Sequence, residues 1–126
     1  MIAGTGVDIV EIERIRAMVS RLNGRFVDRG FTPGEQHFCR RRRDPAPHYA
    51  ARFAAKEALF KAIGTGWAKG VSWLDCEVVR KDSDAPMIVL RGAAEKRCGQ
   101  MEVKRIHLSL SHSDNYAVAM VILEKE

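Results

Sequence analysis

A long helix is predicted by the segment RFAAKEALFKAIGTG, residues 52–66. At 3.6 residues per turn, its aromatic residues stack on one side and its alanines fall on another, so both sides can be buried. The aromatic side comprises Tyr49, Phe53 and Phe60, and the small side comprises Ala51, Ala54, Ala55, Ala58 and Ala62. A helix that is apolar on two sides is expected to lie inside the fold, with the rest of the chain packed around it.

Glu57 and Lys61 lie between the two apolar sides of this helix, one turn apart. The simplest interpretation is an exposed ion pair, which at this spacing contributes only about 0.2 to 0.5 kcal/mol. Packing alone explains poorly why two charges stand on a helix that is otherwise almost entirely apolar. A functional role for both residues is therefore the alternative interpretation.

A short strand is predicted over residues 2–10, and Asp8 lies in it among β-branched neighbours. An acid in such a strand costs stability unless a positive charge compensates it. Near the C-terminus, residues 106–111 alternate between apolar and polar, a polar loop spans 112–115, and an apolar strand spans 116–123. This pattern predicts a β-hairpin.

The remaining segments predict shorter elements. Apolar residues recur at helical spacing over 11–23, and Asn23-Gly24 supplies a stop, so a first amphipathic helix is expected there. Its apolar residues are Ile12, Ile15, Val19 and Leu22. The capping signature Thr32-Pro33-Gly34-Glu35 begins a second helix that is expected to run to about Arg42.

Two prolines, Pro45 and Pro47, follow the second helix. Residues that precede proline avoid the helical region, so the segment 40–47 is expected to leave it, and the long helix is expected to begin near His48. Beyond residue 66, strands are predicted over 73–80 and 87–90, and a short helix over 93–101. Together these elements predict an α+β fold with a mainly antiparallel sheet and a long central helix.

The chain has 126 residues, a length that supports one domain spanning 1–126. No stretch approaches the roughly 20 apolar residues that cross a bilayer, and the N-terminus lacks the pattern of a signal peptide, so we expect a cytoplasmic protein. The three cysteines, Cys39, Cys76 and Cys98, are odd in number and contain no C-x-x-C pair. They are expected to be reduced thiols or small core residues, not disulfides or zinc ligands.

Three segments in this order carry the functional signal: GTGVDIVEIERI at 4–15, the helix with its glycines at 52–66, and LSLSHS at 108–113. Together they resemble the holo-acyl-carrier-protein synthase family, the small group of 4'-phosphopantetheinyl transferases. The resemblance covers most of the chain and is loose between Gly34 and His48. It implies a 4'-phosphopantetheinyl transferase-like domain and a homotrimer whose active sites lie between subunits.

The resemblance further implies an activity in fatty acid biosynthesis: transfer of 4'-phosphopantetheine from coenzyme A to a serine of apo acyl carrier protein, with release of 3',5'-ADP. Charge accumulates on oxygens in such a reaction. Mg²⁺ is the expected cofactor, because it bridges phosphate oxygens and one or two carboxylates while keeping several waters. Asp8 and Glu57 are the expected ligands, and Lys61 is expected to reach the phosphates. Asp8, Glu57 and a metal-bound water all remain candidates for the general base.

The resemblance also implies coenzyme contacts from Arg52, Lys61, the segment Gly64-Thr65-Gly66 and His112, the last from the same or a neighbouring subunit. Without the resemblance, Arg52 is expected to be a solvated helix residue and His112 a loop histidine with a satisfied hydrogen bond. The glycines follow the helix, whereas those of a P-loop precede one, so a helix C-cap is expected at Gly64. Missing side chains would also let the coenzyme lie against this backbone.

The net charge of +5 favours an anionic partner: nucleic acid, an anionic membrane or an acidic protein. Arg14, Met18 and Arg21 project within about 60° of one another on the first helix, a stripe that suits an acidic carrier-protein helix. We therefore expect neither nucleic acid nor a membrane as partner. The alternatives are a small nucleic-acid-binding module that uses Arg40 to Arg43, and a coenzyme A binding acyltransferase that needs no metal.

Overall fold

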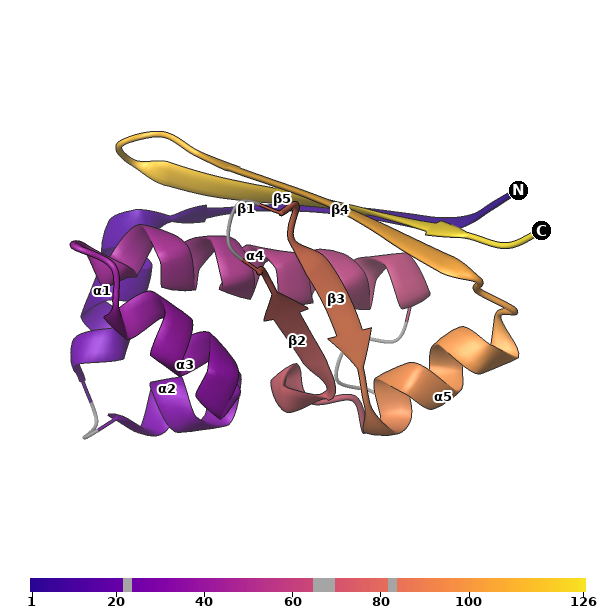
Figure 1. Cartoon of the computed structure of the whole chain (residues 1–126), viewed down its shortest axis with the longest axis horizontal. Coiled ribbons are helices and arrows are strands. Elements are labelled where there is room, and N and C mark those ends of the chain that lie inside the picture. Colours follow the sequence, from indigo (N-terminus) through magenta and orange to yellow (C-terminus); the bar gives the residue numbers. More distant parts are fainter. Residues whose placement is uncertain (22–23, 65–69, 82–83) are drawn as a thin grey trace.

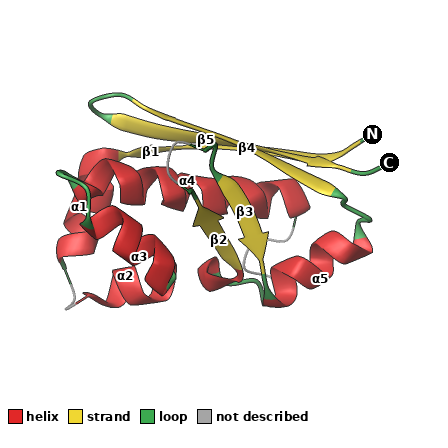
Figure 2. Cartoon of the chain, viewed as in Figure 1, coloured by secondary structure: helices red, strands yellow, loops and turns green. Residues whose placement is uncertain are grey.

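The long helix α4 (Pro45–Ile63) lies below a three-stranded antiparallel sheet in this computed structural model (Figure 1). The structure describes residues 1–21, 24–64, 70–81 and 84–126. The sheet contains β1 (Ile2–Glu11), β5 (Tyr116–Glu124) and β4 (Arg105–His112), in that order. Near the start of α4 lie α1 (Ile12–Ser20), α2 (Arg25–Gly30) and α3 (Pro33–Arg40). A second, two-stranded sheet of β2 (Cys76–Val79) and β3 (Met87–Leu90) runs from β4 toward α5 (Gly92–Gln100), and β2 and α5 contact α4 (Figure 2).

This arrangement confirms the α+β class, the antiparallel pairing and the long central helix. The strand predicted over 2–10 is β1, the predicted hairpin is β4 with β5, and the strand predicted over 87–90 is β3. Most of α4 is buried, as its two apolar sides predicted. Among the described residues, no helix has the length and apolar character needed to cross a membrane.

Glycines allow the backbone of β1 to lie directly on α4. A Cβ atom at Gly4 would collide with the carbonyl oxygen of Ala62, and one at Gly6 with that of Ala58. Alternate residues of a strand share a face, so Asp8, two residues after Gly6, leaves β1 on the side of α4. The contact between small residues therefore positions the acid of the strand beside the helix.

A buried ion pair connects α4 with α3. The Lys56 ammonium lies 2.8 Å from the Glu35 carboxylate, and both side chains are fully buried. Lys56 also donates to the carbonyl oxygens of Trp73, at 2.9 Å, and Cys76. The capping box predicted at Thr32 is confirmed, and Glu35 thus caps α3 and holds the central helix at the same time.

The expected start of the long helix near His48 is wrong, since α4 begins at Pro45. Proline is tolerated in the first turn because its missing N–H would have no partner within the helix. Asp44 is the N-cap residue, and its side chain accepts a hydrogen bond from the backbone of Ala46. The prolines therefore begin α4 instead of preceding it.

Two other expectations need correction. The first helix ends at Ser20, and α2, which was not predicted, follows Gly24, a residue with a φ of 82°. Leu22 and Asn23 lie outside the described residues. The strand expected over 73–80 is shorter, because Trp73–Asp75 forms a 3-10 turn in which the Asp75 carboxylate accepts from the Ser72 backbone. β2 begins only at Cys76.

The cysteines are small core residues, as expected. Cys39, Cys76 and Cys98 are free and buried. Burial raises the pKa of the Cys39 and Cys76 thiols to about 12, because the charged thiolate loses its hydration inside the protein. These thiols are protonated at neutral pH and are poor nucleophiles.

Replacing Gly6 with alanine is expected to destabilise the fold by about 1 to 3 kcal/mol, the usual cost of overpacking, because the new methyl group meets helix backbone. Gly99→Ala is the matched control. Nothing lies near a Cβ at Gly99, so alanine in α5 should be neutral or slightly stabilising. Urea unfolding measures both variants, and equal stability for the two would contradict the direct contact between β1 and α4.

Candidate functional site

Asp8 and Lys61 form an ion pair between β1 and α4. The Lys61 ammonium donates to the Asp8 carboxylate at 2.9 Å and to the carbonyl oxygen of Val7 at 3.0 Å. The Asp8 side chain is 17% exposed and that of Lys61 58% exposed, so the pair lies at the protein surface. Lys61 thus supplies the positive charge that an acid in β1 requires. Among the described residues, Lys61 therefore forms its ion pair with Asp8 and not with Glu57, as the simple interpretation expected.

Glu57 lies one turn before Lys61 and is partly buried. Its carboxylate oxygen Oε2 accepts a hydrogen bond from the indole nitrogen of Trp73 at 3.1 Å. Trp73 was not expected near this site, because the sequence pattern only suggested the start of a strand there. The structure has a 3-10 turn at this position instead of a strand, and this turn brings the indole to α4.

Two carboxylates, Asp8 and Glu57, are the available metal ligands beside this turn of α4. The residues that the structure describes contain no cluster of three or more His, Cys, Asp or Glu side chains that could hold a metal ion. Mg²⁺ commonly uses only one or two carboxylates and fills its other positions with water and phosphate oxygens. The donor set therefore fits Mg²⁺ bound together with a phosphate ligand, and fits poorly a metal held by protein alone.

A second part of the site is a cavity of about 310 Å³ between α3, α4 and β4. Its lining includes Phe38, Arg42, His48, Arg52, Arg80 and His112. The expectation that Arg52 is solvated is wrong: the residue is 3% exposed, and its guanidinium lies 3.9 Å over the Phe38 ring. Its Nε is buried without a hydrogen-bond partner among the described residues. Arg52 and His112, both expected to contact the coenzyme, thus line one cavity.

Positive charge dominates this cavity. His48 and His112 lie 6.1 Å apart between ring centroids, and Arg42 lies 3.9 Å over Phe38. Burial, with Arg52, Arg42 and His112 nearby, lowers the pKa of His48 below its ordinary value, and burial also lowers the pKa of Arg52. An anion would relieve both effects. Sequence reasoning missed His48, although it precedes Arg52 by one helical turn.

Arg52 and Lys61 point in different directions from α4. They are nine residues apart, which places them about 180° apart around the helix. The cationic cavity and the Asp8–Lys61 pair are therefore on opposite sides of α4 within one chain. Gly64 ends the helix in the left-handed region, with a φ of 72°, which confirms the expected C-cap. Thr65 and Gly66 lie outside the described residues.

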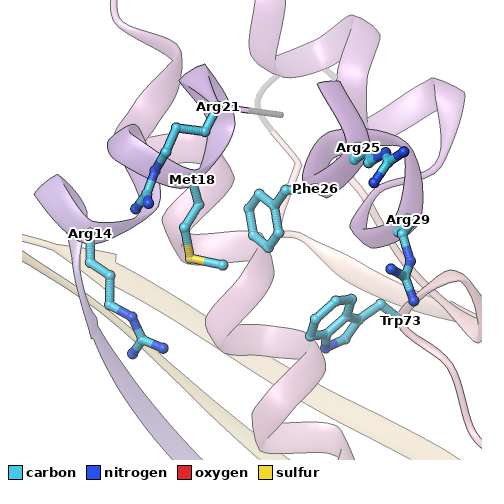
Figure 3. A pocket seen from close by; sticks show the side chains of 7 residues that line it. All are labelled: Arg14, Met18, Arg21, Arg25, Phe26, Arg29 and Trp73. Carbon is cyan, nitrogen blue, oxygen red and sulfur yellow. The ribbon is translucent and has the colours of Figure 1, made fainter. Parts of the chain in front are cut away.

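A larger cavity of about 630 Å³ is lined by all three residues of the predicted stripe, although only Arg14 and Met18 lie on α1, since Arg21 is the extended residue that follows the helix. It is lined by Arg14, Met18, Arg21, Arg25, Phe26, Arg29 and Trp73. In Figure 3, Arg14 and Arg21 stand on one side and the two arginines of α2 on the other, and the apolar side chains lie between them. The part that α2 contributes could not be expected, since this helix was not predicted. We call this hollow the basic–aromatic cavity.

The chain matches the family described as the 4'-phosphopantetheinyl transferase superfamily over residues 4–121. It therefore belongs to this superfamily. The match covers the strand with Asp8, the helix with Arg52, Glu57 and Lys61, and the hairpin with His112.

The relatives and solved structures similar to this chain are holo-acyl-carrier-protein synthases. A holo-acyl-carrier-protein synthase of Koribacter versatilis is 48% identical over 124 residues, covering 98% of this chain and 99% of the relative. One of Geotalea daltonii is 47% identical, covering 99% and 100%. Among solved structures, the Neisseria meningitidis synthase has a TM-score of 0.89 at 33% identity, covering 99% and 100% of the two chains. The Helicobacter pylori synthase in complex with coenzyme A has a TM-score of 0.82 at 31% identity, covering 95% and 99%.

The cationic cavity predicts a measurable pKa. NMR titration of His48 should give a pKa below the ordinary value of about 6.5, because burial and the neighbouring guanidinium groups of Arg52 and Arg42 oppose protonation. Adding sulfate at constant ionic strength should raise this pKa, since an anion in the cavity favours the protonated ring. His107, in β4 outside the cavity lining, is the internal control. A His48 pKa at or above the ordinary value would contradict the cationic character of the cavity.

Proposed function

We propose that this protein is a magnesium-dependent holo-acyl-carrier-protein synthase that acts in fatty acid biosynthesis. It transfers 4'-phosphopantetheine from coenzyme A to a serine of apo acyl carrier protein and releases 3',5'-ADP. The observation that carries the proposal is the Asp8–Lys61 pair beside Glu57, found in a chain that belongs to the phosphopantetheinyl transferase superfamily. The basic–aromatic cavity adds a surface suited to an acidic protein. A cytoplasmic location remains a prediction.

The reaction divides its demands among these residues. The serine oxygen forms a bond to the phosphorus next to pantetheine, the bond from that phosphorus to 3',5'-ADP breaks, and the serine proton leaves to a base. When bound by Asp8 and Glu57, Mg²⁺ would stabilise the charge that develops on the phosphate oxygens. Lys61 adds a positive charge on the side of α4 that carries Glu57 and faces Asp8. Arg52 offers positive charge, and His112 a ring N–H donor, to the phosphates of the nucleotide.

The activity is tested by incubating the protein with apo carrier, coenzyme A and Mg²⁺ and measuring the intact mass of the carrier. A phosphopantetheine adduct is expected, and a carrier whose modifiable serine is replaced by alanine should stay unmodified. Loss of the adduct on chelation is expected. Carrier modification that survives complete chelation would favour the metal-independent acyltransferase instead, and no adduct at all would contradict the proposal.

Asp8→Asn and Glu57→Gln should each lower turnover by orders of magnitude, because stabilisation of developing charge by a metal contributes several kcal/mol. Asp8→Asn should fold because the Asp8–Lys61 pair lies at the surface and such pairs contribute about 0 to 1 kcal/mol, and Glu57→Gln should fold because the amide oxygen can still accept from Trp73. Glu95→Gln, an exposed acid on α5, is the control. Turnover is measured at limiting Mg²⁺. If a variant keeps wild-type turnover there, the replaced residue is not a metal ligand.

A homotrimer with sites between subunits is part of the proposal. The face of the sheet that points away from α4 exposes Val7, Ile9, Tyr116 and Met120, each at least 45% exposed. Val7 lies directly opposite Met120 in the pairing of β1 with β5, so these side chains form a continuous apolar surface. Such surfaces commonly mark protein interfaces. Association would also allow the cationic cavity of one subunit to face the Asp8–Lys61 pair of another.

Mixed trimers test whether the site crosses subunits. His112→Ala and Glu57→Gln proteins should each be inactive as pure trimers. Refolding them together should restore some activity, because certain interfaces then contain an intact residue from each chain. If mixed trimers demonstrably form and no activity returns, His112 acts within its own subunit or outside the site.

Carrier recognition is assigned to the stripe Arg14, Met18 and Arg21, now part of the basic–aromatic cavity. Arginines around an apolar floor suit an acidic helix that carries one apolar side chain. Contacts of this kind between exposed charges are weak but steer the encounter, and salt screens them.

Arg14→Glu should therefore raise the KM for the carrier far more than Arg14→Ala, since charge reversal adds repulsion to the lost attraction. The KM for coenzyme A should barely change. Lys96→Glu, on α5, makes the same change of charge away from the cavity and serves as control. Both constants are measured at low and high ionic strength. An equal effect on coenzyme A, or carrier use without salt dependence, would place the docking surface elsewhere.

A further inference from the structure

Trp73 belongs to two parts of the molecule at once. Its indole lines the basic–aromatic cavity together with Phe26 (Figure 3), and its nitrogen donates to the Glu57 carboxylate at 3.1 Å. The ring packs against Phe53 at 5.4 Å and Phe26 at 6.1 Å between centroids. One rigid side chain thus contacts both the surface suited to the carrier and a carboxylate suited to the cation.

The backbone of Trp73 is held from within the core. Its carbonyl oxygen accepts a hydrogen bond from the buried ammonium of Lys56 at 2.9 Å, and Lys56 is paired with Glu35. Lys56 directly precedes Glu57 on α4. The same turn of helix therefore anchors the main chain of Trp73 and receives the hydrogen bond from its side chain, so the indole has little freedom to leave the carboxylate.

We propose that Trp73 is a positioning residue, which orients Glu57 for the divalent cation and links cation binding to occupation of the basic–aromatic cavity. The inference rests on the proposed function for the identity of cation and carrier. A donor on one carboxylate oxygen fixes the carboxylate plane and leaves the other oxygen for the metal, the usual task of groups that surround metal ligands. Because the ring also lines the cavity, a carrier side chain packed on it restrains the same hydrogen bond.

The first arm of the test measures cation affinity without any carrier. Trp73→Phe keeps an aromatic ring and removes the indole N–H. Electron paramagnetic resonance of Mn²⁺, with the protein saturated by coenzyme A, should show about tenfold weaker binding for this variant. Met18→Leu, a change on the α1 side of the same cavity, should keep the wild-type affinity. In a Glu57→Gln background, Trp73→Phe should have no further effect, a coupling that a general packing role would not produce.

The second arm measures the link between the two sites. A labelled apo carrier whose modifiable serine is replaced by alanine should bind the wild-type protein more tightly when Mg²⁺ is present, and Trp73→Phe should abolish that difference. Coupling between two bound ligands is reciprocal, so bound carrier should tighten Mn²⁺ binding by the same factor. Equal Mn²⁺ affinity in wild type and Trp73→Phe, or an unchanged effect of Mg²⁺ on carrier binding in the variant, would overturn the proposal.

Tryptophan fluorescence provides a readout that does not depend on replacing Trp73. The chain contains two tryptophans, so Trp67→Phe leaves Trp73 as the sole emitter. Its emission should shift when Mg²⁺ is added to the complex with coenzyme A, and emission that stays constant while Mn²⁺ binds would contradict the proposal. Failure of the proposed function can be distinguished from failure of this inference. The first would appear as an unmodified carrier in the mass measurement, even if Trp73→Phe still weakened Mn²⁺ binding.

Discussion

The contact between the backbones of β1 and α4 is the constraint on which the rest of the structure depends. Gly4 and Gly6 bring the strand so close that a single methyl group would collide with the helix. Ala58 and Ala62 supply the matching small surface. Asp8 leaves the strand on the side of this contact and meets Lys61 of α4 at 2.9 Å. Packing and chemistry thus depend on the same short segments.

Charged residues on α4 serve different purposes on different sides of the helix. Lys56 points into the core, where Glu35 and two carbonyl oxygens compensate its charge. A buried pair of this kind adds little net stability over apolar residues, but removing one partner is costly, so it enforces the arrangement of α3, α4 and the 3-10 turn. Glu57, the next residue, lies at the edge of the core, and Arg52 lines a cavity on another side. One helix therefore organises the core, the carboxylate site and the cationic cavity.

Local patterns predicted much of this arrangement, and long-range contacts explain what they missed. Neighbouring residues alone determine three features, which could therefore be predicted: the apolar sides of α4, the alternation of β4 and the capping box at Thr32. The motifs around Asp8, Glu57 and His112 pointed to the site through family resemblance. Trp73 could not be placed, because its role depends on a turn between distant elements. Arg52 looked solvated because nothing near it in sequence shows that Phe38 and β4 cover it.

The central claim is that Asp8 and Glu57 hold the cation while Arg52 and His112 hold the nucleotide. Crystals grown with coenzyme A and Mn²⁺ test it directly, because the anomalous scattering of Mn²⁺ locates the ion without reference to any assumed ligand. We expect one anomalous peak within about 2.2 Å of oxygens from both carboxylates, with the nucleotide phosphates in the cationic cavity. A peak away from either carboxylate, or phosphates bound outside the cavity with Arg52 and His112, would contradict the account.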